Sequence, residues 1–239
     1  TIVKPYDYLQ EKGLVYKRVG SGTFVSPLAY NKDQMDTNEV ESLETAQIEL
    51  MEGMINLASA TPTSDFFPVE DFKKVINKVL DRDKGRAFGY QDSKGYFPLR
   101  ATLVDYLKKN NINTDVDSIQ IISGAQQGID IIAKALLRHG DYVIAESPTY
   151  TGAIATFKSR GVNILEIPIG EKGIDLKTTK EYIRKYKPKL IYTMPNFQNP
   201  TGLTYCEETK KELIQLANKY NVPIVEDDFA SDLSFYTKD

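Results

Sequence analysis

Residues 142–169, YVIAESPTYTGAIATFKSRGVNILEIPI, decide the fold because they contain a complete strand–helix–strand pattern. The runs YVIAE (142–146) and NILEIPI (163–169) are short and apolar, and they predict buried strands. The segment between them, YTGAIATFKSRG (150–161), predicts a helix that Gly161 closes. Strands that alternate with helices predict a mostly parallel sheet.

The same alternation continues on both sides of this unit. Upstream, SIQII (118–122) predicts a strand, and GAQQGIDIIAKALLRHG (124–140) predicts a helix. The apolar face of that helix consists of Ile129, Ile132, Ala133, Leu136 and Leu137. Downstream, the chain alternates helix, strand, helix and strand over 175–186, 188–194, 206–220 and 222–228. We therefore expect an α/β fold, in which helices cover both faces of the sheet.

The chain before residue 118 has a different character. PVEDFKKVINKVLD (68–81) and PLRATLVDYLKKN (98–110) predict amphipathic helices, with a loop over 88–97 between them. Residues 27–55 carry one basic and seven acidic residues, and they predict a polar linker with a helix near 38–52. Residues 1–26 have a net charge of +2, so we expect a domain boundary after them.

Composition limits the class of protein. The 239 residues are 41% hydrophobic and 26% charged, which is ordinary for a globular protein. Cys206 is the only cysteine, which excludes an intrachain disulfide and a zinc cluster. No apolar run has the length of a membrane span and no signal peptide opens the chain, so we expect a cytoplasmic protein without a membrane partner. Since the chain begins with Thr1 and not with methionine, we expect it to be cut from a longer protein.

Small and polar residues follow the predicted strands, at the sheet edge where such folds bind ligands. SGAQQG (123–128) opens a helix, and a helix N-terminus binds anions, most often phosphate. The loop lacks the lysine of a P-loop, and ordinary packing would also explain its glycine and alanine. Tyr150 follows the next strand, where it is either a ligand contact or a packing residue.

Two further strand ends carry an amide and a carboxylate. In IYTMPNFQNPTG (191–202), two prolines stiffen a loop that contains Asn199, which serves either ligand recognition or turn formation. In EDDFASD (226–232), carboxylates follow an apolar strand, and a buried one needs a cationic partner. A phosphate site, an aromatic face, an amide and a carboxylate together would fit pyridoxal 5′-phosphate.

The motifs SGAQQG, ESPTY, NPTG and EDD occur in the order and approximate spacing of fold type I, class I/II pyridoxal-phosphate aminotransferases. The resemblance begins near Asn56 and implies an aminotransferase-like domain over 56–239, which corresponds to the large domain of that fold. It implies that the amides of Gly124 and Ala125 and the side chain of Gln126 hold the phosphate. It also implies that Tyr150 stacks on the ring, Asn199 bonds the phenolic oxygen and Asp227 pairs with the ring nitrogen.

The resemblance also implies a homodimer, because Tyr90 in YQDSKG matches a tyrosine that contacts the cofactor phosphate of the neighbouring subunit. Two positions depart from the pattern. Phe229 and Ala230 stand where the family usually has a tyrosine shortly after the aspartate. The Schiff-base lysine is expected beyond Asp239, since Lys238 is too close to Asp227. We therefore assign no catalytic residue and expect no transamination by the chain as given.

The first 26 residues predict a helix that ends at Gly13 and two strands, LVYKR (14–18) and GTFV (22–25). The Gly-Ser-Gly turn between the strands predicts a hairpin, because a strand and not a helix follows it. The segment resembles the end of the winged helix-turn-helix of GntR-type regulators. With the acidic linker and the aminotransferase-like domain behind it, the chain resembles the MocR subgroup of that family.

This resemblance implies a DNA-binding regulator with pyridoxal phosphate as cofactor and an amino compound or the vitamer itself as effector. The residues expected to face DNA, mainly its phosphates, are Thr1, Lys4, Lys17, Arg18, Gly20 and Ser21. A solvated basic face is the alternative for the lysines, and Pro5 is expected to kink or shorten the helix. Two other functions stay open: an aminotransferase of amino acids whose extension only resembles a wing, and a scaffold without a cofactor.

Overall fold

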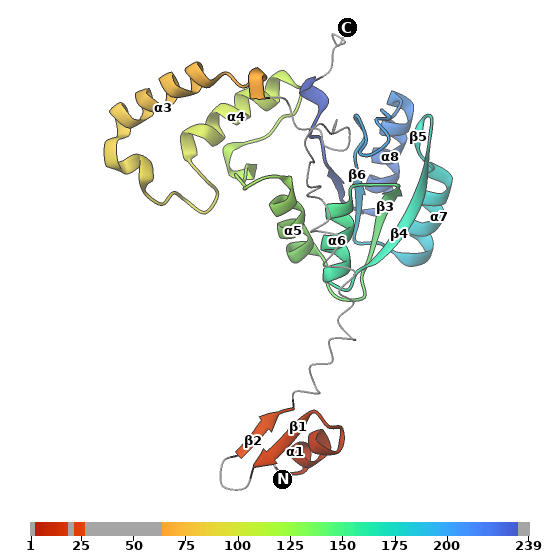
Figure 1. Cartoon of the computed structure of the whole chain (residues 1–239). Coiled ribbons are helices and arrows are strands. Elements are labelled where there is room, and N and C mark those ends of the chain that lie inside the picture. The colour runs from red at the N-terminus through yellow and green to blue at the C-terminus, as the bar shows by residue number, and fades with distance from the viewer. Residues whose placement is uncertain (1–2, 19–21, 27–63, 234–239) are drawn as a thin grey trace, which may run out of the picture. The chain divides into compact units, whose positions relative to one another are not determined.

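The computed structural model describes residues 3–18, 22–26 and 64–233 of the chain (Figure 1). The predicted helix near 38–52 and the residues Thr1, Gly20 and Ser21 lie outside the described residues. The chain divides into two compact units, one from residues 1–47 and 133–239 and the other from residues 48–132. Each unit is described by itself below.

The N-terminal segment forms the helix and hairpin that the sequence predicts. Helix α1 (Val3–Glu11) is followed by strands β1 (Val15–Arg18) and β2 (Gly22–Val25), which pair antiparallel. The rings of Tyr16 and Phe24 stack across the hairpin with centroids 5.8 Å apart. Pro5 does not stop α1, which continues past it to Glu11.

A five-stranded sheet of order β5-β4-β3-β6-β7 forms the centre of the first unit. Strands β3 (Tyr142–Ser147), β4 (Asn163–Gly170), β6 (Leu190–Thr193) and β7 (Ile224–Glu226) are parallel, which confirms the predicted α/β sheet. Strand β5 (Gly173–Ile174) pairs antiparallel with β4 and was not predicted, because two residues form no recognisable pattern.

Helices cover both faces of this sheet (Figure 1). Helices α7 (Leu176–Tyr186) and α8 (Glu207–Tyr220) pack on the face that carries Ile144 and Ile191. Helix α6 (Thr151–Ser159) packs on the other face, where the Phe157 ring meets the edge of Tyr192 with centroids 5.9 Å apart. Successive residues of β6 thus contact opposite helical layers.

The prediction of a strand over 118–122 is wrong. Residues Val116–Ser118 form the 3₁₀ helix η5, and the residues after them form no strand. A strand requires a hydrogen-bonded neighbour, whereas the Ile121 amide donates instead to the Lys94 carbonyl of a loop at 2.9 Å. Leu136 was also misplaced: it is 48% exposed at the end of helix α5 (Ala125–Leu136), while Ile129, Ala133 and Leu137 are buried.

The second unit contains the two predicted amphipathic helices, α3 (Val69–Asp83) and α4 (Phe97–Lys109). Short 3₁₀ helices, η3 (Ser64–Phe66) and η4 (Lys84–Phe88), flank α3, and the first unit contains another, η6 (Ser231–Leu233). In the part of the chain that the structure describes, no helix is both long and apolar enough to span a bilayer.

We predict that Gly173→Ala destabilises the first unit. Gly173 has φ +118°, and a Cβ atom there would lie 2.6 Å from Cγ of the buried Tyr205 ring. Backbone strain and overpacking together should cost about 2–4 kcal/mol of unfolding free energy, measured by urea denaturation. Gly170→Ala is the matched control, since its nearest atom would be the Gly173 carbonyl oxygen at 4.0 Å. Equal losses in both variants would contradict the steric argument.

Candidate functional site

Three of the predicted site residues follow three strands that are consecutive in the sheet order. Tyr150 follows β3, Asn199 follows β6 and Asp227 follows β7, and β3, β6 and β7 lie side by side. Because these strands are parallel, their carboxyl ends meet at one edge of the sheet. The fold therefore brings an aromatic ring, an amide and a carboxylate to neighbouring positions of that edge.

The alternation of side chains in β7 separates the two neighbouring aspartates. Ile224 packs against the α7–α8 layer, so Asp227, three residues later, belongs to the α6 face. Its Oδ2 atom accepts a hydrogen bond of 2.7 Å from the Tyr192 hydroxyl, and its amide donates to the Thr193 carbonyl at 3.0 Å. Asp228 is exposed, whereas Asp227 is half-buried. Of the two, only Asp227 is joined to the α6 face.

Tyr192 contacts the predicted site residue Asp227, and the sequence reasoning missed it. Its side chain is completely buried, and burial raises the pKa of its hydroxyl far above the usual range. The hydrogen bond to Asp227 raises this pKa further, as do the charges of Asp227 and Glu146 and the nearby Tyr150 hydroxyl. The hydroxyl therefore stays protonated and directs its proton to Asp227. A tyrosine within an otherwise apolar strand was the available signal.

A second missed residue is Glu146 at the end of β3, a buried carboxylate that is 1% exposed. Its Oε1 atom accepts hydrogen bonds from the Thr193 hydroxyl (2.6 Å), the Met194 amide (2.8 Å) and the Tyr205 hydroxyl (2.6 Å). Its Oε2 atom accepts one from the Gln198 amide at 2.9 Å. Among the described residues no cation pairs with it, so neutral donors alone replace its water.

The side chain of Gln198 makes four hydrogen bonds that hold the loop after β6. Its Nε2 atom donates to Glu146 and, at 2.7 Å, to the Pro148 carbonyl. Its Oε1 atom accepts from the amide and the hydroxyl of Thr201 at 3.1 and 2.7 Å. By contrast, no described residue hydrogen-bonds the side chain of the half-buried Asn199. Turn formation thus involves Gln198, and the Asn199 amide is left available for a ligand.

The predicted phosphate loop lies in the second unit. Gly124 has φ +86° and is exposed, and Ala125 begins helix α5. The Ser123 amide donates to Oε1 of Gln127 at 2.5 Å, so Gln127 closes this turn while Gln126 is half-buried. The exposed start of a helix of 12 residues has the partial positive charge that anions prefer.

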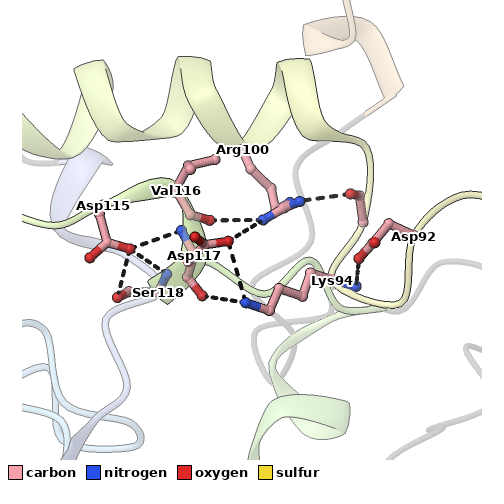
Figure 2. A network of polar contacts seen from close by, with 8 residues as sticks. Asp92, Lys94, Arg100, Asp115, Val116, Asp117 and Ser118 are labelled. Carbon is pink, nitrogen blue, oxygen red and sulfur yellow. Dashed lines mark hydrogen bonds and ion pairs between the residues drawn. The ribbon is translucent and has the colours of Figure 1, made fainter.

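Tyr90 is fully exposed, and the loop that follows it is held by a polar network (Figure 2). The buried Arg100 guanidinium donates to the carbonyls of Gly95 at 3.2 Å and Val116 at 2.8 Å. The Lys94 amide donates to Asp92 at 2.8 Å, and the Lys94 ammonium donates to the Asp117 carbonyl at 2.9 Å. The network holds residues 92–95, and the exposed Tyr90 ring lies two residues before them.

The predicted DNA-contacting residues are described only in part. Lys17 and Arg18 are exposed on β1. The Lys17 ammonium pairs with Asp7 of α1, and the Arg18 guanidinium lies over the Tyr16 ring at 5.7 Å from its centroid. Lys4 belongs to α1. Thr1, Gly20 and Ser21 are outside the described ranges.

A mostly parallel α/β sheet whose strand ends carry these residues defines an aminotransferase-like protein. The sequence family described as "Aminotransferase class I and II" matches residues 52–237. The chain belongs to this family. Pyridoxal phosphate is the cofactor that the family implies.

Known relatives include both enzymes and regulators. The 2-aminoadipate transaminase of Thermus thermophilus is 34% identical over 184 residues, which cover 77% of this chain and 45% of that protein. The uncharacterized HTH-type transcriptional regulator YdfD of Bacillus subtilis is 30% identical over 249 residues, which cover 98% of this chain and 51% of that protein. The chain therefore spans about half the length of the curated relatives it matches.

A solved relative shows the same fold. The crystal structure of LysN, the α-aminoadipate aminotransferase of Thermus thermophilus complexed with N-(5′-phosphopyridoxyl)-L-leucine, has a TM-score of 0.68 and 32% identity. The match covers 79% of this chain and 48% of that chain.

The residues at the sheet edge fit pyridoxal phosphate. No described residue donates a hydrogen bond to Oδ1 of Asp227, and none bonds the side-chain hydroxyl of Tyr150 or the amide of Asn199. A carboxylate oxygen, a phenol ring and an amide are thus available for a ring nitrogen, an aromatic face and a phenolic oxygen.

We predict that the first unit loses stability steeply above about pH 10, the usual pKa of tyrosine. Burial raises the pKa of the Tyr205 hydroxyl most, and the charge of Glu146 raises it further. Burial is also the largest cause of the raised pKa of Tyr192. Both hydroxyls therefore keep their protons in the folded state while the unfolded chain releases them. Each should lower the unfolding free energy by about 1.4 kcal/mol per pH unit above that pH.

The measurement is urea unfolding between pH 8 and 11 for the native chain and for Tyr192→Phe/Tyr205→Phe. The double variant is less stable at neutral pH but should have a flatter slope at high pH. An unchanged slope would show that other groups cause the alkaline loss.

Proposed function

We propose that the protein is a DNA-binding transcriptional regulator whose aminotransferase-like domain binds pyridoxal phosphate and senses an amino compound or the vitamer. One observation carries this proposal. The similarity to the regulator YdfD covers 98% of the chain, whereas the family match begins only at residue 52. The segment before that residue is thus shared with a regulator, and its described part forms a helix and a hairpin.

The N-terminal segment is proposed to be the C-terminal part of a GntR-type winged helix-turn-helix, which would place the protein in the MocR subgroup. In this proposal residues 1–26 belong to the DNA-binding domain, residues 27–55 are the linker and residues 56–239 bind the cofactor. The exposed Lys17 and Arg18 on β1 support phosphate contacts by the hairpin. A protein with this function acts in the cytoplasm, where it reaches DNA.

The cofactor site is proposed to consist of the residues that the family resemblance assigns to it. Asp227 would pair with the ring nitrogen, Tyr150 would stack on the ring and Asn199 would bond the phenolic oxygen. The phosphate would be held by Gly124, Ala125 and Gln126. A bound cofactor would supply an electron-accepting ring, and the carboxylate of Asp227 would favour the protonated form of its ring nitrogen.

A homodimer is proposed from the exposure of Tyr90. An exposed tyrosine ring suits a contact with another subunit, and the resemblance assigns it to the phosphate of the partner's cofactor. The site would then be complete only in the dimer.

An aminotransferase of amino acids is the second candidate. The 34% identity to the 2-aminoadipate transaminase supports it, because this match lies within the cofactor domain. The two candidates share the cofactor site and differ at the N-terminal segment. DNA binding therefore distinguishes them.

We predict that Asp227→Ala weakens pyridoxal-phosphate binding about 100-fold, whereas Asp228→Ala changes it less than about threefold. Removal of Asp227 leaves the pyridinium without its counter-charge, while Asp228 is exposed. Titration of the cofactor, followed by its absorbance, measures both affinities. If Asp228→Ala gives the larger loss, the assignment of the two carboxylates on β7 is wrong by one residue.

We also predict that Lys17→Ala/Arg18→Ala weakens DNA binding without changing sequence preference. In a protein with the complete N-terminal domain, the slope of log K against log salt should fall by about 2, since each phosphate contact contributes about 0.9. Lys180→Ala/Lys211→Ala, two exposed lysines of the cofactor domain, is the control. Absence of any DNA binding by the unmodified protein would favour the aminotransferase.

A further inference from the structure

We infer that Gln198 is a positioning residue that joins the loop after β3 to the loop after β6, so that Tyr150 and Asn199 are placed together. The inference rests on the proposed cofactor site, because it explains how two of its side chains are held. Gln198 itself is 1% exposed and acts through its neighbours.

The hydrogen bonds of the Gln198 side-chain amide define its orientation. Its two N–H groups meet acceptors only, the Glu146 carboxylate at 2.9 Å and the Pro148 carbonyl at 2.7 Å. Its oxygen meets donors only, the amide and the hydroxyl of Thr201. A rotated amide would place like groups against each other at both ends, so a single orientation is stable.

The contacts of Gln198 reach both proposed site residues along the backbone. Pro148 is two residues before Tyr150, which is also the N-cap residue of α6. Asn199 is the next residue after Gln198, and the Gly202 amide closes the same turn by donating to the Gln198 carbonyl at 2.6 Å. A shift of one loop therefore pulls on the other through one buried side chain.

The connection between the two loops depends on the hydrogen bond from Gln198 to Glu146. The Oε1 atom has three donors from the sheet and from Tyr205, but the one described donor to Oε2 is Gln198. Loss of Gln198 leaves a buried carboxylate oxygen without that donor, which is costly in a site from which water is excluded. The loops should then move apart to admit water to this oxygen.

The test swaps the two residue types, glutamate and glutamine, between positions 146 and 198. Gln198→Glu places two carboxyl groups together, and Glu146→Gln places two amide N–H₂ groups together. In Glu146→Gln/Gln198→Glu, the new amide can still accept from Thr193, Met194 and Tyr205 and can donate to the new carboxylate, but the Pro148 carbonyl loses its donor. Asn196→Ala is the matched control, since Asn196 lies in the same loop but bonds Lys210 at 3.0 Å.

Two measurements are made on the chain. Hydrogen exchange is followed in peptides that cover 147–152 and 196–203, without cofactor. Pyridoxal phosphate is then added, and the circular dichroism of its absorption band reports the affinity and the placement of the ring.

Each single exchange variant and Gln198→Ala should accelerate hydrogen exchange about tenfold in both loops and weaken cofactor binding about tenfold. The double variant should exchange more slowly in 196–203 and bind the cofactor more tightly than either single exchange variant. Its residues 147–152 should keep the faster exchange, because the Pro148 carbonyl has no donor, while Asn196→Ala should resemble the unmodified chain. Faster exchange in 196–203 alone would overturn the inference, as would a double variant no better than the single ones. If both loops respond but the unmodified chain gives no dichroic band with pyridoxal phosphate, the coupling stands and the proposed function fails.

Discussion

The buried carboxylate of Glu146 is the constraint on which the functional edge of the sheet depends. A charged group in a site without water needs donors from the protein, and here they come from β6, the loop after it and Tyr205. Hydrogen bonds to a charged group contribute about 1.5–3 kcal/mol each, so four of them can offset a large desolvation cost. The same bonds fix the separation of β3 and β6 at their carboxyl ends. Hydrogen bonds around Glu146, and not apolar packing, therefore hold the loops after β3 and β6 in place.

The alternation of side chains divides the sheet edge into two chemically different sides. Thr193, Glu146 and Tyr205 lie with the α7–α8 layer and form the buried polar centre. Tyr192 and Asp227 lie on the α6 face and are joined by a hydrogen bond of 2.7 Å. Adjacent residues of one strand therefore belong to separate groups: Tyr192 bonds the proposed cofactor contact Asp227, and Thr193 bonds Glu146 of the polar centre. Structural and functional demands do not compete for the same side chains.

Periodicity predicted most of the fold, because four strands and their helices alternate with regular spacing. It failed at 118–122, where an apolar run has the composition of a strand but bonds to the Lys94 loop, and no local pattern reveals a missing neighbour. Tyr150, Asn199 and Asp227 could be named from the strand ends and from family resemblance. Glu146, Tyr192 and Gln198 were missed because their roles arise from contacts 35 to 59 residues apart in the sequence. Such contacts depend on the register of neighbouring strands, which the sequence does not display.

The network around Arg100 has a consequence for sequence variation in this part of the chain. Arg100 bonds the backbone carbonyls of Gly95 and Val116, so it recognises the path of the chain and not the identity of Val116. Gly95 is different, since it has φ +97° and a Cβ atom there would lie 2.5 Å from Ile121. Selection that preserves the position of Tyr90 should therefore act on Arg100 and Gly95, while Val116 can drift. Homologous regulators and enzymes could then diverge widely in this loop and still present the same aromatic ring.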